Sequence, residues 1–592
     1  MRELGEKRSL TGKIWRWRAE ETPSYQAITR QLGLDTALAP LLAGRSLDSP
    51  EQVLEFFSPR LQRLADPDAL MDMDKAVDRL VRALQENEKI AVFGDYDVDG
   101  ATSSALLFHY FRSLGVTLRV YIPDRLTEGY GPSPAAMEQL AKEGIGLIIT
   151  VDCGISAFQA LQSAGQLGMD VIVTDHHQPS VDGLPEAWAV INPNRLDDTF
   201  PHKELAGVGV AFYLVMALNR RLRSMEWFEG EIQEPDLKNL LDLVALGTIS
   251  DLAKLVGLNR VLVHAGMKVA SQTDKPGLQA LYRLAGVPAE QDIWGLGVDQ
   301  IGFQVGPRIN AGGRLDRGSL GYELLAGQDS QRVEEIAQIL DASNRERREI
   351  EKTILDEAMA IVQQRNLAET RMGLVVAGEN WHPGVVGIVA SRLVEKFHRP
   401  AIVAAVDREG KAKASGRSIP GVDLLGTIQT LHGMLLNFGG HRAAVGLSMA
   451  AERLEEFAIA FDARLRHTYP AETFWPLLTV DSEISLAQAD RRLVEHIQRF
   501  QPFGMGNPEP IFVLHGVKVS FTRLLNERHV KCVLTDEMGH RLEAIAFRCW
   551  PGLLGEGLLK SGSTLDVAGV ISLNRFRGEE RIQMVIKDAR LG

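Results

Sequence analysis

Three clusters of acidic residues and histidines follow three short apolar segments of the chain. They are Asp95-Tyr96-Asp97-Val98-Asp99, Asp152-Cys153-Gly154 and Asp175-His176-His177. Carboxylates packed together raise one another's pKa values unless cations neutralise them. Carboxylates and imidazoles are also ligands of divalent metal ions. The clusters therefore predict a metal site, provided that the fold brings them together.

The segments before the clusters indicate how they would meet. Residues 89–93, 145–151 and 170–173 are short, rich in β-branched residues and not alternating, which predicts parallel strands buried on both faces. Ligands of open α/β sheets bind at the carboxyl ends of such strands. Any single cluster has an alternative interpretation as a turn or the N-cap of the next helix. Three clusters at equivalent positions favour one site.

The histidine pair and one more aspartate complete the candidate ligands. Because successive side chains of a strand point to opposite faces, we expect only one of His176 and His177 to ligate a given metal. A purely structural histidine pair is the alternative. Asp251 follows a helical pattern at 237–244 and a predicted Gly247-Thr248 turn. We expect Asp251 to be a further ligand, with helix capping as the alternative.

The composition limits the class of protein. The chain has 592 residues, of which 45% are hydrophobic, so we expect about three to five soluble domains. No apolar segment approaches the roughly 20 residues of a membrane span, and residues 1–18 lack the apolar core of a secretory signal, which favours the cytoplasm. Cys153, Cys532 and Cys549 are too few for a disulfide framework. We expect Cys153 to fill the core.

The charge balance argues against a polyanionic substrate only in part. The formal net charge is -12, which repels phosphates at long range. Carboxylates neutralised by metal ions contribute to that total without the same local repulsion. The segment 306–314 contains two arginines, an asparagine and three glycines. This composition favours a loop that approaches phosphates closely, with an ordinary surface turn as the alternative.

Periodicity divides the chain into an uninterpreted segment at 1–75 and four further parts. Alternating strand and helix signals predict a doubly wound parallel α/β sheet within a domain at 76–327. An unbroken run of helix formers at 330–366, within a connecting part assigned to 328–368, predicts one helix of roughly 55 Å. Its polar middle, 341–349, is predicted to be solvated.

The third part, 369–470, is predicted to be a second α/β domain. Its expected elements are strands at 372–377, 401–406 and 411–415, a helix at 384–397, and small-residue turns at 414–418 and 438–441. The last part, 471–592, is predicted to be a small closed β-barrel of the oligonucleotide-binding (OB) type with strands at 511–521, 529–535, 541–547, 564–573 and 581–587.

The barrel carries a mixture of cations and aromatic residues. These are Lys531, Phe547, Arg548, Trp550, Arg575, Phe576 and Arg577. Such a mixture is typical of surfaces that bind single-stranded nucleic acid. A structural barrel with ordinary surface charge is the alternative.

Taken in order, the motifs resemble those of the DHH phosphoesterase superfamily. They are Asp97-Val98-Asp99-Gly100, Val151-Asp152-Cys153-Gly154, Asp175-His176-His177 and Gly247-Thr248-Ile249-Ser250-Asp251. The segments 306–314 and 439–441 extend the likeness to the RecJ family of bacterial single-stranded-DNA-specific exonucleases, over about residues 89–592. One departure is Gly312, where that family more usually has alanine; we expect it to be tolerated.

The resemblance implies a 5′-to-3′ exonuclease that hydrolyses single-stranded DNA to 5′-mononucleotides in DNA repair and recombination. It implies two divalent ions held by Asp97, Asp99, Asp152, His176 and Asp251, with Asp152 bridging. Asp95 and Asp175 would be ligands or supports, and His177 would contact the scissile phosphate. Mixed carboxylate and imidazole ligands favour Mn²⁺, with Mg²⁺ as a substitute.

The resemblance also implies how substrate is held. Arg308, Asn310 and Arg314 would grip backbone phosphates, Arg125, Ser415 and Arg417 would anchor the 5′-terminal phosphate, and His441 would lie near the scissile group. A channel too narrow for duplex would give single-strand specificity without base readout. The expected partners are single-stranded DNA, a single-stranded-DNA-binding protein and repair helicases. The chain is expected to be a monomer without a membrane partner.

Three alternatives remain at this point. A phosphodiesterase of short oligonucleotides or cyclic dinucleotides within the same superfamily usually lacks the C-terminal barrel. A haloacid-dehalogenase-like phosphatase would use the first Asp of Asp97-Val98-Asp99-Gly100 as a nucleophile, but that fold lacks an Asp-His-His cluster. A non-catalytic DNA-binding scaffold would be favoured by missing ligands, whereas every expected metal position is filled here.

Overall fold

The computed structural model describes residues 8–20, 22–124, 128–129, 131–180, 182–287, 297–315, 317–576 and 579–591; the side chains of 314–315, 575–576 and 579 are outside this description. The chain forms two compact units. We call residues 59–349 with 502–508 the central unit, and the remainder the composite unit. In the described ranges, no helix combines the length and apolar character that crossing a membrane requires.

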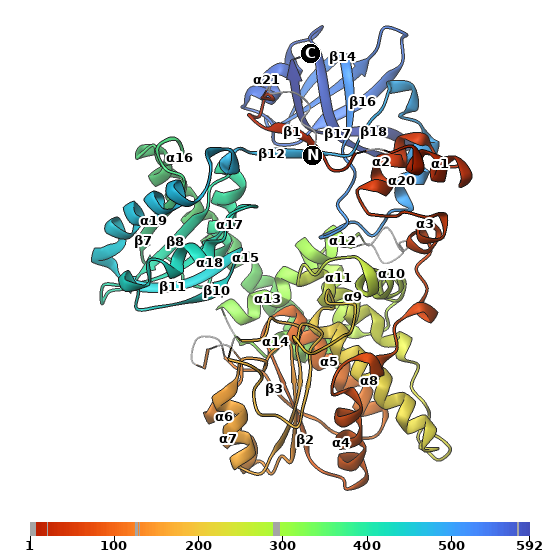
Figure 1. Ribbon diagram of the computed structural model, residues 1–592, viewed down its shortest axis with the longest axis vertical. Coiled ribbons are helices and arrows are strands. Elements are labelled where there is room, and N and C mark those ends of the chain that lie inside the picture. The colour runs from red at the N-terminus through yellow and green to blue at the C-terminus, as the bar shows by residue number, and fades with distance from the viewer. Residues whose placement is uncertain are drawn as a thin grey trace. The chain divides into compact units, whose positions relative to one another are not determined.

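A five-stranded parallel sheet organises the central unit (Figure 1). The strand order is β3-β2-β4-β5-β6, with bounds Arg119–Tyr121, Ile90–Gly94, Leu147–Val151, Asp170–Thr174 and Ala189–Ile191. Strands β2 and β4 are buried throughout, as predicted from their unbroken apolar runs. The connections reverse direction between these two strands. Such a switch point opens a crevice at the carboxyl ends of the strands.

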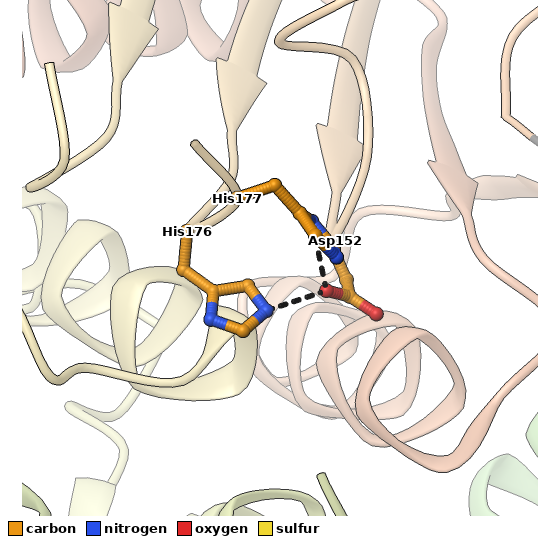
Figure 2. Close-up of side chains that lie close together, drawn as sticks. All are labelled: Asp152, His176 and His177. Carbon is orange, nitrogen blue, oxygen red and sulfur yellow. Dashed lines mark ion pairs between the residues drawn. The ribbon is translucent and has the colours of Figure 1, made fainter. Parts of the chain in front are cut away.

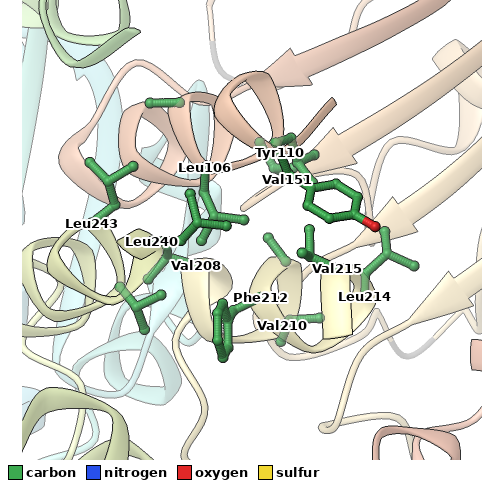
Figure 3. Close-up of a cluster of buried hydrophobic side chains, with 14 of the residues drawn as sticks. Leu106, Tyr110, Val151, Val208, Val210, Phe212, Leu214, Val215, Leu240 and Leu243 are labelled. Carbon is green, nitrogen blue, oxygen red and sulfur yellow. The ribbon is translucent and has the colours of Figure 1, made fainter. Parts of the chain in front are cut away.

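Helices cover both faces of this sheet, which confirms the doubly wound architecture. One face carries α4 (Met73–Gln85), α5 (Val98–Ser113) and α8 (Gly207–Ser224), and the other carries α6 (Pro134–Lys142) and α7 (Phe158–Gln166). Leu106 and Tyr110 of α5 pack with Val151 of β4 and with apolar residues of α8 (Figure 3). This core fixes α5 and α8 against the carboxyl end of β4.

The segment 306–314 was predicted to be a loop, and that prediction is wrong. It forms helix α13 (Gly306–Leu315). A Cβ atom on Gly313 would lie 2.8 Å from Cδ2 of Tyr96, and one on Gly312 would lie 3.0 Å from Cδ2 of Leu340. The glycines therefore let a helix pack closely, with no open loop. An alanine at position 312 would also lie 3.2 Å from the carbonyl oxygen of Arg317, so both this backbone and the flexible Leu340 side chain would have to shift slightly.

The long helix was predicted almost to its ends. Helix α15 (Ser330–Gln364) has 35 residues, or roughly 52 Å at 1.5 Å per residue. Its polar middle is not solvated all round, contrary to prediction, because Ser343, Asn344 and Arg347 are buried. These positions are one, three and four residues apart and so share one side of the helix.

The composite unit contains a second, mixed sheet of order β10-β11-β9-β8-β7. Its strands are Asn437–His441, Ala444–Ala450, Lys411–Arg417, Ala401–Val406 and Leu374–Glu379, and helix α17 is Val386–Phe397. The predicted strands and helix are confirmed. The predicted small-residue turns at 414–418 and 438–441 are wrong, because these residues lie mainly in β9 and β10. Both strands pair with β11 in register.

The C-terminal part is the predicted closed barrel. Five strands follow the order β14-β15-β16-β18-β17, and β14 pairs with β17 to close it. Their bounds are Phe512–Leu525, His529–Thr535, Arg541–Ala546, Glu579–Leu591 and Thr564–Phe576. A closed barrel of five strands is consistent with an OB-type fold.

The N-terminal segment, which carried no interpretable motif, is joined to the barrel region. Strand β1 (Ile14–Trp17) pairs in parallel with β12 (Leu477–Val480). Nε1 of the buried Trp15 donates to Asp588 at 3.0 Å, and Nε of Arg18 donates to Asp481 at 2.6 Å. The N-terminal strand and the barrel region are thus packed together.

Candidate metal centre

The first acidic cluster lies where β2 meets α5. Asp97 is the N-cap of α5 and accepts from the Gly100 amide at 3.0 Å. Asp95 accepts from the amide of Tyr96 at 2.8 Å. A Cβ atom on Gly100 would lie 2.4 Å from the carbonyl oxygen of Asp95. Glycine is therefore required for the helix to begin this close to the strand end.

Asp99 points from α5 toward the start of α8. Its carboxylate is buried and accepts from the amides of Gly207 at 2.7 Å and Val208 at 2.8 Å. Free amides at a helix N-terminus stabilise an anion. A Cβ atom on Gly207 would lie 2.9 Å from Oδ2 of Asp99 and 3.1 Å from Oδ1 of Asp152. Gly207 thus lets two carboxylates share the end of one helix.

Asp152 directly follows β4 and is buried, with 1% of its surface exposed. Its φ of 58° lies in the left-handed region, which costs free energy for a non-glycine residue and concentrates at functional sites. Neither carboxylate oxygen has a hydrogen-bond donor among the described residues. A buried carboxylate without donors is strongly destabilising. A bound cation would remove that penalty.

Both histidines approach Asp152 (Figure 2). Nε2 of His176 lies 3.1 Å and Nδ1 of His177 lies 3.8 Å from Oδ1 of Asp152. The expectation that the two imidazoles would point to opposite faces is therefore wrong. Strand β5 ends at Thr174, before the histidines. The alternation of a strand no longer applies once the chain has turned.

The turn is made by Asp175. One of its oxygens accepts from the amides of His176 at 2.7 Å and His177 at 3.0 Å, and from Nδ1 of His177 at 2.8 Å. The other accepts from the amide of Ile155 at 3.0 Å. Burial alone would raise the pKa of Asp175, but its bonds to His177 and the backbone lower it. Of the two roles expected for Asp175, these contacts favour support over ligation.

Asp251 reaches the same centre from α9 (Leu241–Ser250). The predicted Gly247-Thr248 turn is wrong, because these residues lie inside the helix. A Cβ atom on Gly247 would lie 2.3 Å from Oγ1 of Thr102, so this glycine allows α9 to cross α5 closely. Oδ2 of Asp251 lies 3.9 Å from Nε2 of His176.

The described residues offer three sets of ligand atoms that lie within 4.8 Å of one another. The sets are Asp95, Asp97 and Asp152; Asp99, His176 and Asp251; and Asp152, His176 and His177. Hard oxygen atoms with one or two imidazoles fit Mn²⁺ and are compatible with Mg²⁺. The residues present therefore fit two divalent ions, with Asp152 in two of the three sets.

Burial and mutual repulsion shift the titration of these groups in the protein without metal. Burial first, and the neighbouring carboxylates second, raise the pKa of Asp152, that of Asp99 to about 7 and that of Asp251 to about 8. Burial also lowers the pKa of His176 to about 4. His176 is thus neutral, as a metal ligand must be.

Two asparagines that support the histidines were missed from the sequence. Nδ2 of Asn194 donates to the carbonyl oxygen of His176 at 2.5 Å, and Nδ2 of Asn192 donates to that of His177 at 2.9 Å. Asn192 follows β6, at the same edge of the sheet as the three acidic clusters. Reading Ala189–Ile191 as a fourth apolar strand would have identified both.

The candidate phosphate-binding residues of the central unit differ in their surroundings. Arg308 is bound internally: Nε donates to Asp341 at 2.9 Å and Nη2 to the carbonyl oxygen of Leu284 at 3.1 Å. Asn310 accepts from the amide of Val98 at 3.2 Å, beside the first cluster. Arg125 and the Arg314 side chain lie outside the described residues.

In the composite unit, Ser415 and Arg417 occupy alternate positions of β9. A Cβ atom on Gly387, in the first turn of α17, would lie 3.1 Å from Nη2 of Arg417 and 3.5 Å from Oγ of Ser415. Arg417 is in register with Ala444, which is in register with His441. The side chains of Ser415 and Arg417 thus lie beside the first turn of α17.

The barrel candidates are partly described. Lys531 pairs with Glu543 at 2.8 Å, so its charge is partly neutralised. Phe547 is 56% exposed and contacts the His529 ring edge-on. Of the remaining candidates, Arg577 and the Arg575 and Phe576 side chains fall outside the described residues.

Family models match three separate parts of the chain. The model of the DHH family, N-terminal domain, matches residues 89–248. The DHHA1 domain matches residues 370–467, and the RecJ OB domain matches residues 480–588. The metal-ligand candidates from Asp95 to His177 lie within the first match, and Ser415, Arg417 and His441 lie within the second.

Curated relatives and solved structures match the chain over most of its length. A single-stranded-DNA-specific exonuclease RecJ from Bacillus subtilis is 36% identical, covering 97% of this chain and 70% of the relative. One from Dickeya dadantii is 40% identical, covering 89% and 92%. The crystal structure of RecJ in complex with Mn²⁺ from Thermus thermophilus has a TM-score of 0.80 and 27% identity, covering 98% and 80%. A Mg²⁺ complex from the same organism has a TM-score of 0.73.

Proposed function

The chain belongs to the RecJ family of single-stranded-DNA-specific exonucleases, and from this premise we propose that it degrades single-stranded DNA from the 5′ end to 5′-mononucleotides. The observation that carries the proposal is the buried Asp152 carboxylate. Neither of its oxygens has a donor among the described residues, and two imidazoles approach it. A cation-dependent reaction centre explains this arrangement better than a structural one.

We assign one of the ligand sets to each of the two ions. Asp95, Asp97 and Asp152 would hold one ion, and Asp99, His176 and Asp251 the other, with Asp152 bridging. When bound, two such ions activate a water molecule and stabilise the leaving oxygen of a phosphodiester. The chain needs no nucleophilic side chain for this chemistry. We assign Mn²⁺ as the preferred ion and Mg²⁺ as its substitute, since the ligands include an imidazole.

His177 is suited to the scissile phosphate. Burial alone would lower its pKa, but the hydrogen bond and charge of Asp175 and the other carboxylates raise it to about 9. A protonated imidazole donates from both nitrogens. Nδ1 is directed at Asp175, so Nε2 is the nitrogen that we assign to a phosphate oxygen. Asp175 thereby acts on the substrate through His177.

Binding of the 5′ terminus is assigned to Ser415 and Arg417. The planar guanidinium donates two parallel hydrogen bonds to a terminal phosphate, and the amides at the start of α17 add further donors. Arg125 is assigned to the same phosphate, Asn310 and Arg314 to backbone phosphates, and His441 to the scissile group. The ion pair with Asp341 favours a structural role for Arg308.

We assign the binding of long single-stranded substrates to the OB-type barrel. We assign 76–327 as the catalytic domain, 328–368 as the connecting helix, 369–470 as the substrate-binding domain and 471–592 as the nucleic-acid-binding domain. Exposed aromatic and cationic groups around Phe547 suit stacking on unpaired bases. A single-stranded-DNA-binding protein and repair helicases are proposed partners of a monomeric cytoplasmic enzyme.

Product analysis tests this function. A 5′-phosphorylated single strand labelled at its 3′ end, the matching duplex and a dinucleotide are compared with Mn²⁺ present. We expect the single strand to be shortened from its 5′ end with release of mononucleotides, and the blunt duplex to be resistant. Faster hydrolysis of the dinucleotide or of a cyclic dinucleotide would instead establish the alternative phosphodiesterase activity.

A further inference from the structure

A short turn from the C-terminal half of the chain is built into the central unit. Residues 502–508 lie between α20 (Arg491–Gln498) and β14, which both belong to the composite unit, yet they pack with the central unit. Gly504 and Asn507 close the turn with two backbone hydrogen bonds of 2.9 and 3.1 Å. Nδ2 of the fully buried Asn507 donates to the carbonyl oxygen of Pro502 at 2.7 Å.

This turn contacts the loop that directly follows Asp251. The amide of Leu255 donates to the carbonyl oxygen of Met505 at 2.7 Å. A Cβ atom on Gly504 would lie 2.7 Å from Cδ1 of Leu255, and one on Gly506 would lie 3.1 Å from Cβ of Lys254. At both glycines the backbone of the turn therefore lies close to side chains of the loop. The fit requires glycine at both positions of the turn.

The loop itself begins in a strained conformation. Leu252, the residue after Asp251, has a φ of 57°, which is unfavourable for a residue with a branched side chain. Nδ2 of Asn259 holds the loop at the carbonyl oxygen of Lys254 at 3.1 Å. A strained conformation persists when its surroundings over-determine it. The turn supplies part of those surroundings.

We propose that the 502–508 turn positions Asp251 in the metal centre. The inference rests on the proposed function, in which Asp251 is a metal ligand. Asp251 is the C-cap of α9, so the path of the following loop sets the direction of its carboxylate. Groups that orient a ligand commonly change metal affinity or activity by about 10- to 100-fold. The C-terminal part of the chain thus completes the catalytic site as well as binding DNA.

A pair of matched glycine substitutions tests the proposal in the full-length chain. Gly506 and Gly539 have φ values of 76° and 87°, so alanine is similarly strained at both. Only at position 506 would the new methyl press on Lys254 and Val256, because the space around Gly539 is open. We expect Gly506→Ala to weaken Mn²⁺ binding by roughly 10-fold, measured by calorimetry, and Gly539→Ala to leave it unchanged.

Kinetics supply a second measurement. At limiting Mn²⁺, Gly506→Ala should lower kcat on a short single strand while KM for that strand stays within about 2-fold, because positioning a ligand is not binding DNA. Saturating Mn²⁺ should restore most of kcat. Asn507→Ala, which removes the bond to Pro502, should repeat the pattern and replaces Gly506→Ala in both assays if that variant does not fold.

Two reference proteins separate the possible failures. If the unmodified chain binds no Mn²⁺, the proposed function itself is wrong. If the unmodified chain binds Mn²⁺ and Asp251→Asn weakens that binding, but Gly506→Ala and Asn507→Ala bind Mn²⁺ normally, only the positioning role is wrong. If Gly506→Ala lost more thermal stability than Gly539→Ala but bound Mn²⁺ normally, the turn would likewise serve folding alone.

Discussion

The metal centre of the central unit and the five-stranded mixed sheet of the composite unit use glycine for opposite purposes. Around the metal centre, a Cβ atom on Gly100, Gly207 or Gly247 would lie within 3 Å of another atom. In the second sheet, Gly439 and Gly446 are paired across β10 and β11, and a Cβ atom on either would meet open space. The first set brings buried groups together. The second leaves backbone accessible beside Ser415.

This contrast separates the requirements of chemistry from those of binding. The metal centre brings together carboxylates that are mostly buried, so its elements pack closely at the ends of parallel strands. The second sheet is mixed and has open space at Gly439 and Gly446, where we propose that a sugar–phosphate backbone approaches. Substitutions in the first region should therefore change metal binding and turnover. Substitutions in the second should change affinity for the substrate.

The largest effect is expected from Asp152→Ala. Loss of this residue, which we propose as the bridging ligand, should leave less than a few percent of turnover, because two-metal stabilisation of the transition state contributes several kcal/mol. Affinity for a single strand should change by less than about 2-fold, since Asp152 is assigned to the metal ions and the phosphate contacts are assigned to other residues. Turnover with saturating Mn²⁺ and binding by fluorescence anisotropy measure the two quantities.

Asp68→Ala is the matched control, because Asp68 is an exposed aspartate of the same unit. It should retain normal turnover. Turnover above a few percent in Asp152→Ala would show that Asp152 does not bridge the ions, even if the fold is intact.

The second-largest effect is expected when glycine is changed to alanine at the metal centre, compared with the same change in the second sheet. Gly207→Ala would press on Asp99 and Asp152, so we expect a loss of about 1–3 kcal/mol in the free energy of unfolding and roughly 10-fold weaker Mn²⁺ binding. Gly446→Ala meets open space and should leave stability within about 0.5 kcal/mol. Its effect should be confined to KM for single-stranded DNA.

Thermal unfolding and Mn²⁺ titration of both variants check this contrast. Equal losses of stability, or weaker Mn²⁺ binding in Gly446→Ala, would contradict the separation between the two sheets.

The sequence predicted the strands and ligands that local patterns determine. Buried parallel strands are uniformly apolar, and an acidic residue directly after each one lies at a shared edge, so Asp95, Asp152 and Asp175 were found together. The 35-residue helix followed from the absence of Gly and Pro. Both inferences depend on residues close in sequence.

The errors occurred where contacts between distant segments decide the structure. The alternation of side chains along a strand could not predict the directions of the His176 and His177 imidazoles, because Asp175 turns the chain before them. Glycine composition suggested a loop at 306–314, whereas Tyr96 and Leu340 pack against a helix there. The pairing of β1 with β12 joins residues far apart in the chain, such as Ile14 and Leu477, and no local pattern records it.

The pH dependence of stability offers a third test. In the metal-free protein the pKa values of Asp99 and Asp251 are raised to about 7 and about 8, far above the value of about 3.9 for an unfolded aspartate. The folded state therefore holds more protons, and its stability falls as pH rises toward 8. The raised pKa of His177, about 9, acts in the same direction above about pH 6.5.

Bound Mn²⁺ should reverse this trend, because it favours the ionised carboxylates. We expect the increase in Tm on adding Mn²⁺ to be larger at about pH 8 than at about pH 6.5, measured against samples with chelator. In Asp251→Asn the difference between the two pH values should shrink. A Mn²⁺-induced shift that is independent of pH would indicate that these carboxylates do not ligate the ion.

The smallest expected effect concerns the second sheet. Arg417 and Ser415 are assigned to the 5′-terminal phosphate, for which a guanidinium provides two parallel charge-assisted bonds. A 5′-phosphorylated strand should therefore be degraded several-fold faster than its 5′-hydroxyl equivalent, as expected for about 1–2 kcal/mol of interaction. Arg417→Ala should remove most of that preference. Competition between the two strands in one reaction measures the ratio directly.

Arg408→Ala serves as the control, because Arg408 is an exposed arginine in the loop between β8 and β9. It should keep the preference for the phosphorylated strand. A contact made only to the terminal phosphate increases the degradation rate of the phosphorylated strand alone. Its loss should therefore leave the degradation rate of the 5′-hydroxyl strand unchanged. If Arg417→Ala slowed both equally, Arg417 would instead bind backbone phosphates along the strand. The 5′ polarity would then have to arise at the metal centre, and the separation of chemistry from binding would no longer hold.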